Sequence, residues 1–140
     1  MTGAMNYEAI KVQKTGAVAH ISLNRPALRN AMSLQMVAEL RSALATLEAA
    51  GDVRVLVLRG AGGHFCAGAD LQDMAAARMR ARQNLPEPSE AGVALDAVAQ
   101  ANAQFGALCV AYATTPLALV VVLEGTTAFL QKRKPSWASQ

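Results

Sequence analysis

The segment from Gly60 to Asp70 has the sequence GAGGHFCAGAD. It contains the residue types of this chain that could take part in binding or catalysis. A phosphate-binding loop would end in Gly-Lys followed by Ser or Thr, and a dinucleotide-binding loop would need a third glycine where Phe65 stands. His64, Cys66 and Asp70 could bind a metal ion, but no second group of ligands accompanies them. A tight strand-to-helix turn, in which the glycines serve steric needs alone, stays open beside these functional interpretations.

A different chemistry fits the details of this segment better. Ala67, Gly68 and Ala69 leave the main chain accessible, and Asp70 is placed to cap a helix that begins near Leu71. Amides at a helix N-terminus carry partial positive charge. An amide aimed at a carbonyl oxygen that becomes an oxyanion stabilises the transition state more than the ground state. We therefore predict chemistry done by the backbone, which explains a segment rich in residues without functional groups.

Apolar patterning predicts the strands that come before this segment. Residues 10–12 and 18–23 are typical of two strands of a hairpin, with a loop around Thr15-Gly16 that is wider than the two-residue type. Pro26 is incompatible with a central strand and begins a loop that extends to Asn30.

A helix and a buried strand follow. Ser33 is placed to cap a helix that Gly51 ends. The apolar positions of this helix follow a 3.6-residue period: Met36, Val37, Leu40, Leu44 and Leu47. Residues 53–58 are almost continuously apolar, which is typical of a strand covered on both faces. After the glycine-rich segment, residues 71–81 are expected to be helical and residues 82–89 to be a polar linker.

The last elements complete an α/β pattern. Thr114-Thr115-Pro116 ends a long second helix, whose stripe consists of Val93, Leu95, Val98, Asn102, Phe105, Leu108 and Cys109. Residues 117–123 are typical of another buried strand. The order strand-strand-helix-strand-helix-helix-strand predicts an α/β fold with crossover connections and partly parallel pairing.

The composition narrows the class of protein. The 140 residues are 53% hydrophobic and 16% charged, which supports a core and excludes wholesale disorder. The net charge of +3 comes without a long basic run, and aromatic residues make up only 4%, which disfavours nucleic acid as a partner. The longest apolar run, residues 117–123, is far shorter than the ~20 residues of a membrane span. Because Cys66 and Cys109 lie far apart and no secretory leader is evident, we expect a cytoplasmic protein without disulfides.

Four blocks of the sequence, in their order and spacing, resemble the N-terminal half of the enoyl-CoA hydratase/isomerase (crotonase) superfamily. The blocks are Asn24-Arg25-Pro26, Asn30-Ala31-Met32, residues 55–60 and residues 65–71. Residues 126–138 are similar to the extreme C-terminus of that family. Among its subfamilies, the chain most resembles the isohexenylglutaconyl-CoA hydratases of terpenoid degradation. The resemblance implies a crotonase-like ββα spiral, here its N-terminal half over residues 1–125, followed by a short tail over residues 126–140.

The resemblance also implies an acyl-CoA thioester as substrate, with coenzyme A as part of that substrate and no separate cofactor or metal. The amide of Ala69 would be one of two donors to the thioester oxygen in an enolate-like state. The adenine and pantetheine portions would lie near Ala67, Gly68, Ala69, Asp70, Leu71 and Gln72. The loop around Leu28, Arg29 and Asn30 would border the CoA. Either Arg25 or Arg29 would lie near its phosphates, unless both are solvated surface charges. Family members are commonly trimers or hexamers, which implies a homo-oligomer.

The sequence departs from the family after its last strand. There the family carries a second glycine-rich loop with the other oxyanion donor, and then two glutamates that act as acid and base on water. Here Gly125 is followed by Thr126-Thr127-Ala128-Phe129, and Glu124 corresponds to a position that is not catalytic. The join at Gly125 therefore resembles an internal deletion.

This departure bears on activity. The groups of the family that are not found here contribute to its rate. One oxyanion donor contributes a factor of about 10²–10³ to turnover, and each acid–base group a factor of about 10²–10⁴. The resemblance implies hydration of an α,β-unsaturated acyl-CoA. The alternative is a catalytically inactive fragment of the same fold that binds CoA or oligomerises, and a third reading is an α/β interaction module that binds no CoA.

Overall fold

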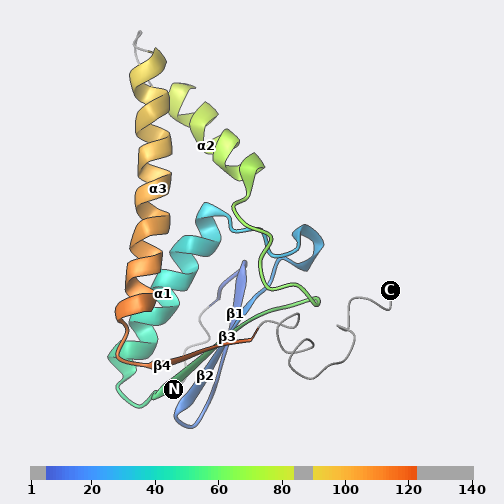
Figure 1. The fold of residues 1–140 in the computed structure, drawn as a ribbon, viewed down its shortest axis with the longest axis vertical. Coiled ribbons are helices and arrows are strands. Elements are labelled where there is room, and N and C mark those ends of the chain that lie inside the picture. Colours follow the sequence, from blue (N-terminus) through green and yellow to red (C-terminus); the bar gives the residue numbers. More distant parts are fainter. Residues whose placement is uncertain (1–5, 84–89, 123–140) are drawn as a thin grey trace.

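The computed structural model describes residues 6–83 and 90–122, and its elements follow the predicted order (Figure 1). The strands form one sheet in the order β1-β2-β3-β4. β1 is antiparallel to β2, whereas β3 runs parallel to both of its neighbours. The α/β class with partly parallel pairing is therefore confirmed.

β1 (Ile10–Thr15) and β2 (Val18–Leu23) form a hairpin that is tighter than the sequence predicts. Thr15 pairs with Val18, so the loop consists of Gly16-Ala17 alone, and the prediction of a wider loop is wrong. Gly16 has a φ of +58°. Two-residue hairpin turns require such a left-handed value at their first central position, and glycine adopts it without steric cost.

α1 (Leu34–Ala50) has the caps and the buried face that its sequence predicts. The Ser33 hydroxyl accepts a hydrogen bond from the Met36 backbone N–H at 3.1 Å, and Gly51 ends the helix with a φ of +72°. The buried face consists of Met36, Val37, Leu40, Ala43, Leu44 and Leu47. It belongs to one core cluster with Ile21 of β2 and Leu56 of the next strand.

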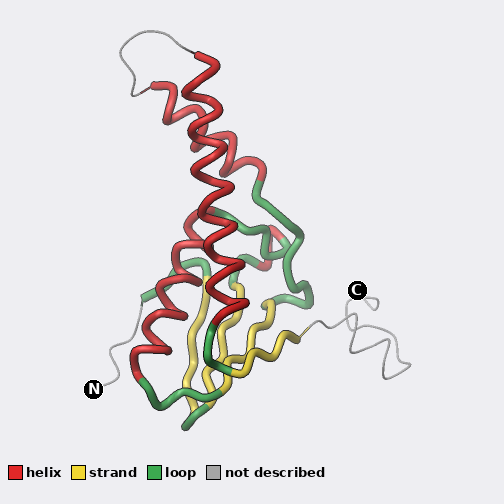
Figure 2. The backbone as a smooth tube through the Cα atoms, turned by 60° about the vertical axis from the view of Figure 1, so that its left-hand side comes forward, coloured by secondary structure: helices red, strands yellow, loops and turns green. Residues whose placement is uncertain are grey.

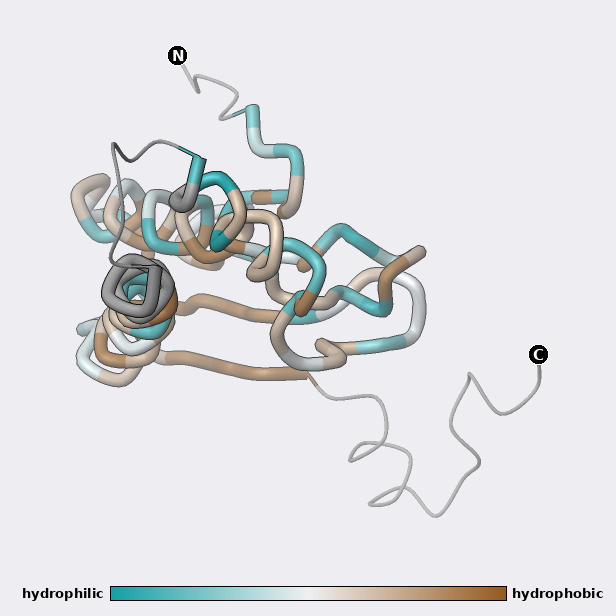
Figure 3. Tube along the Cα trace, turned by 90° about the horizontal axis from the view of Figure 1, so that it is seen from above, coloured by the Kyte–Doolittle hydropathy of each residue, from teal (hydrophilic) through white to brown (hydrophobic). Residues whose placement is uncertain are grey.

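β3 (Val55–Gly60) and β4 (Ala118–Val122) are less covered than the sequence predicts. Leu56 is the only β3 side chain that is buried, and every β4 side chain is exposed. Figure 3 shows the apolar residues of β4 at the margin of the fold, away from α1. The predictions of a doubly covered strand and of a buried last strand are wrong for the described residues. They assumed helices on both faces, as parallel sheets usually have, whereas β4 forms an edge of this sheet.

α2 (Leu71–Gln83) and α3 (Glu90–Thr114) form a pair that extends beyond the sheet (Figure 1). The other end of α3 lies beside α1 (Figure 2), where the Tyr112 hydroxyl donates a hydrogen bond to the Leu40 carbonyl oxygen at 3.1 Å. Leu108 is buried at this contact. The side chains of Val93 and Leu95 lie outside the described ones. Among the other members of the predicted stripe, Val98, Asn102 and Cys109 are exposed, so the prediction is wrong in part.

Several predictions concern residues outside the described ranges. α2 runs past its predicted end to Gln83, and the rest of the predicted linker is not described. The same holds for Glu124, Gly125 and the tail over residues 126–140, so the division at residue 125 stays a prediction. Within the described ranges, no helix is long and apolar enough to cross a bilayer.

Candidate functional site

The loops that follow β2 and β3 are joined by the fully buried side chain of Asn30. Its Oδ1 accepts a hydrogen bond from the Arg25 backbone N–H at 2.9 Å. Its Nδ2 donates to the carbonyl oxygens of Ala61 at 2.8 Å and His64 at 2.7 Å. Asn30 has a φ of +56°, a conformation that asparagine tolerates better than most residues. One residue therefore turns the first loop and holds the second.

Two glycines let the glycine-rich loop pack closely on itself and on its neighbour. A Cβ atom on Gly60 would overlap the carbonyl oxygen of His64. A Cβ atom on Gly62 would lie 2.6 Å from the Cβ atom of Pro26, which begins a short 3-10 helix over Pro26–Leu28. For the first part of the segment, the steric interpretation of its glycines is thus correct.

The second part of the segment contains Ala69, which forms a short parallel bridge with Met32. The Met32 N–H donates to the Gly68 carbonyl oxygen at 2.8 Å, and the Asp70 N–H donates to the Met32 carbonyl oxygen at 2.9 Å. Both polar backbone groups of Met32 are bonded in this bridge, and those of Ala69 are not part of it. No described residue accepts a hydrogen bond from the Ala69 N–H, and Ala69 is exposed.

Asp70 begins α2 and forms an ion pair with Arg25. Its Oδ1 accepts hydrogen bonds from the backbone N–H groups of Gln72 and Asp73, both at 3.1 Å, which confirms the predicted helix cap. Its Oδ2 lies 2.8 Å from Nη2 of Arg25, and 11% of the Asp70 side chain is exposed. The Asp73 N–H and the Arg25 guanidinium hold the pKa of Asp70 below its usual value. Asp70 is therefore an ionised carboxylate with protein partners on both oxygens.

The other carboxylate near Ala69, that of Asp73, is also bonded within the protein. Its Oδ2 accepts a hydrogen bond from the backbone N–H of Leu34 at 2.8 Å. Its Oδ1 lies 4.0 Å from Nη2 of Arg80. The first bond joins the start of α2 to the start of α1, so Asp73 has a structural role.

The remaining predicted contacts to CoA lie on the same two loops and at the start of α2. Most of their side chains are exposed: Leu28, Arg29, Ala67, Leu71 and Gln72. Gly68, also exposed, has a φ of +105°. Arg25 differs from this group, because its guanidinium is bonded to Asp70 and, through Nη1, to the Ala31 carbonyl oxygen at 2.6 Å.

The residues considered as metal ligands do not come together. The Cys66 thiol lies 3.7 Å from the Gly68 carbonyl oxygen, and Asp70 is paired with Arg25. Across residues 6–83 and 90–122, no group of three His, Cys, Asp or Glu side chains is arranged to hold an ion.

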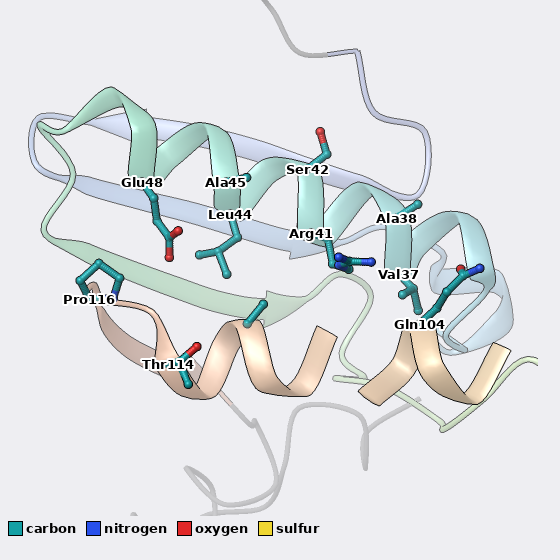
Figure 4. Close-up of a pocket in the computed structure, with 11 residues that line it drawn as sticks. Val37, Ala38, Arg41, Ser42, Leu44, Ala45, Glu48, Gln104, Thr114 and Pro116 are labelled. Atoms are coloured by element: carbon teal, nitrogen blue, oxygen red, sulfur yellow. The ribbon is translucent and has the colours of Figure 1, made fainter. Parts of the chain in front are cut away.

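A groove of about 550 Å³ lies elsewhere, between α1 and the end of α3. Figure 4 shows Arg41 and Leu44 pointing from α1 towards α3 across this groove. Glu48 at its rim accepts a hydrogen bond from the Thr115 hydroxyl at 2.6 Å. None of the site residues predicted from the sequence lines this groove, so it is separate from the Ala69 site.

Two roles in the site were not predicted from the sequence. One is the joint made by Asn30, for which the only local signal is the tolerance of asparagine for left-handed turns. The other is the pair of Arg25 with Asp70. No local pattern connects these two residues, because they meet only when β2 and β3 pair side by side.

Comparisons with known proteins find relatives over the same part of the chain. The family model for "Enoyl-CoA hydratase/isomerase" matches residues 13–102. The peroxisomal Delta(3,5)-Delta(2,4)-dienoyl-CoA isomerase of Arabidopsis thaliana is 42% identical over 67 residues, which are 48% of this chain and 24% of that protein.

Two solved structures extend the match to most of the fold. AtuE of Pseudomonas aeruginosa is 41% identical, with a TM-score of 0.69 over 83% of this chain and 40% of that chain. An enoyl-CoA hydratase/isomerase from Marinobacter aquaeolei is 38% identical, with a TM-score of 0.69 over 82% of this chain and 40% of that chain. The predicted fold class is thus confirmed, and the chain spans well under half the length of these relatives.

Proposed function

Because the chain belongs to the enoyl-CoA hydratase/isomerase family, we propose that it binds an acyl-CoA thioester and stabilises the oxyanion formed during hydration. In that reaction the hydroxyl of water bonds to Cβ of an α,β-unsaturated acyl group, and the thioester becomes an enolate. A proton added at Cα then restores the thioester. The proposal depends on one observation: Ala69 is exposed, and its N–H has no acceptor among the described residues.

The position of this amide supports the proposed role. Ala69 comes immediately before Asp70 and the start of α2, where the backbone N–H groups carry partial positive charge. An N–H held in place by neighbouring backbone needs little reorganisation when negative charge develops on a thioester oxygen. Such a donor stabilises the enolate more than the neutral thioester.

The exposed residues around the amide support a place for the CoA portion of the substrate. We assign the adenine and pantetheine portions to the segment from Ala67 to Gln72 and to Leu28. We assign the CoA phosphates to Arg29, which is exposed on the first loop and whose guanidinium has no partner among the described residues. Charge attraction by an exposed arginine would act on binding of any CoA derivative.

One observation favours the alternative of a CoA-binding chain without turnover. The carboxylates that follow Ala69 most closely in the chain are those of Asp70 and Asp73, and both are bonded within the protein. Hydration needs a group that activates water and a group that protonates Cα. The described residues offer no free pair of carboxylates beside Ala69 for these steps.

Several finer assignments belong to this proposal. We infer a member nearest the isohexenylglutaconyl-CoA hydratases, shortened after Gly125, that works in the cytoplasm as a trimer or hexamer. The motif blocks around Arg25, Asn30 and Ala69 support the family, and the subfamily is inferred from the likeness of the sequence as a whole. The exposed apolar residues of β4 favour association between chains.

Two variants at one position test the role of the amide. Ala69→Pro removes the N–H, and Ala69→Gly keeps it as the matched control. Binding of crotonyl-CoA and of its thioether, S-(2-butenyl)-CoA, in which a methylene replaces the carbonyl, is measured by calorimetry. We expect Ala69→Pro to lose about two- to tenfold of the preference for the thioester, as for loss of one hydrogen bond. An unchanged preference would disprove the role of Ala69.

Turnover separates the hydratase from the binding-only alternative. The rate of crotonyl-CoA hydration by the chain is compared with the rate in buffer. A rate well above buffer that Ala69→Pro lowers supports the hydratase. A rate equal to buffer, together with thioester binding, supports the alternative. Failure to bind either CoA derivative would favour an interaction module.

A further inference from the structure

Arg25 crosslinks the two segments that form the Met32–Ala69 bridge. Its Nη1 donates to the carbonyl oxygen of Ala31 at 2.6 Å, and its Nη2 pairs with the carboxylate of Asp70 at 2.8 Å. Ala31 and Asp70 are the chain neighbours of Met32 and Ala69, the two partners of the short bridge. One planar guanidinium therefore ties together the two sides of the bridge.

The backbone of Arg25 is also bonded within the protein. The backbone N–H of Arg25 is bonded to Oδ1 of Asn30, whose Nδ2 holds the start of the glycine-rich loop at Ala61 and His64. The Arg25 side chain is 22% exposed. A side chain whose two terminal nitrogens are bonded within the protein and whose surface is mostly covered is poorly placed to bind phosphates.

We propose that Arg25 is a positioning residue, which aims the Ala69 N–H at the thioester oxygen by fixing the Met32–Ala69 bridge, and that Arg29 rather than Arg25 binds CoA phosphate. This proposal rests on the proposed function of Ala69.

The local backbone explains why such a crosslink is needed. Gly68, the residue before Ala69, has a φ of +105°, and nothing lies within 4 Å of where its Cβ atom would be. A glycine in open space can rotate with little steric hindrance, and rotation there turns the next amide. The bridge itself has only the two hydrogen bonds of Met32. The planar guanidinium of Arg25, which bonds Ala31 on one segment and Asp70 on the other, restrains this rotation. A preorganised donor stabilises developing charge most effectively.

The test compares the same two ligands, crotonyl-CoA and its thioether, in matched arginine variants. Arg25→Met keeps an unbranched stem of similar shape but removes the guanidinium and with it the crosslink. We expect it to lower the preference for the thioester about two- to tenfold, as Ala69→Pro does, and to leave affinity for the thioether unchanged. Arg29→Met should weaken both ligands equally. Arg41→Met, on the face of α1 at the separate groove, is the control and should change neither.

A conservative variant distinguishes positioning from mere stability. Arg25→Lys keeps a positive charge for Asp70, but an ammonium lacks the planar fork that bonds two groups at once. We expect an intermediate preference for the thioester and a shift of the Ala69 amide resonance smaller than in Arg25→Met. A purely structural role would lower the melting temperature and leave the preference and the resonance unchanged, which would overturn the proposal.

Other results would overturn it as well. If Arg25→Met weakens the thioester and the thioether equally, Arg25 binds phosphate. If Ala69→Pro loses the preference and Arg25→Met keeps it, the positioning role fails and the function of Ala69 stands. If Ala69→Pro keeps the preference, both fail. Should Arg25→Met not fold, Asp70→Asn breaks the ion pair while retaining a residue that caps helices well, and the same loss of preference is expected.

Discussion

β2 and β4 flank the same strand, β3, and both run parallel to it, yet their side chains differ in burial. Ile21 in β2 is completely buried, whereas Val120 in β4 is 47% exposed. Both strands are rich in branched apolar residues, so composition does not explain the contrast. The difference lies in what covers them, because the buried face of α1 packs against β2 and β3, and no described element covers β4 in the same way.

The contrast extends to the loops that leave these strands. The loops after β2 and β3 are joined by Asn30 and by the pair of Arg25 with Asp70. The chain beyond β4 lies outside the described residues. The Ala69 site is therefore built on the covered half of the sheet. Three experiments test whether the two halves differ in this way.

The largest effect is expected in the covered half. Leu56→Ala removes a fully buried side chain from the core, and we expect a loss of about 3 kcal/mol in the free energy of unfolding. Val120→Ala on β4 is the matched change, expected to cost about 0.5 kcal/mol or less because its site is exposed. Urea denaturation measures both. Equal losses would show that β4 is covered in solution.

A smaller effect is expected at the joint between the loops. Asn30→Gly tolerates the left-handed φ but loses the hydrogen bonds to Arg25, Ala61 and His64, so we expect a loss of about 2 kcal/mol in the free energy of unfolding. Hydrogen exchange should speed up in residues 60–70. Asn24→Gly is the control, because its side chain bonds to no described residue. Unchanged exchange after Asn30→Gly would contradict the joint.

The smallest effect is expected at the ion pair, and it depends on pH. Hydrogen bonding by the Asp73 N–H and pairing with Arg25 lower the pKa of Asp70 in the folded chain. A carboxylate with a lowered pKa adds stability that is present above its unfolded pKa and disappears as the pH falls through its folded pKa. We expect Asp70→Asn to cost about 1 kcal/mol at pH 7 and progressively less below about pH 4.

The measurement is denaturation of both proteins across this pH range. A cost for Asp70→Asn that stays constant down to pH 2 would show that the charge of Asp70 contributes nothing. Asp52→Asn is a surface comparison, since Asp52 pairs with Lys14 at an exposed site where salt screens the attraction.

Local features of the fold were predictable because their causes are local. Ser33 and Gly51 bound α1 as expected, and Asp70 caps α2, since a cap depends on residues within one helical turn. The hairpin loop was predicted too wide, because the ladder of β1 and β2 continues to Thr15 and leaves only Gly16-Ala17 as the turn. The resemblance over residues 65–71 pointed to Ala69, and the absence of a described acceptor for its N–H is compatible with that role.

Local sequence signals were enough to predict the helices and strands of this protein, their order and the segment of small residues around Ala69. Hydrophobic period, caps and turn residues act over a few positions, and they operate before any distant contact forms. The exposure of β4 and the contacts of Arg25 with Asp70 and Ala31, in contrast, arise from the way the elements pack together. Burial and long-range pairing depend on which elements pack side by side, and that is a property of the assembled sheet rather than of any one segment.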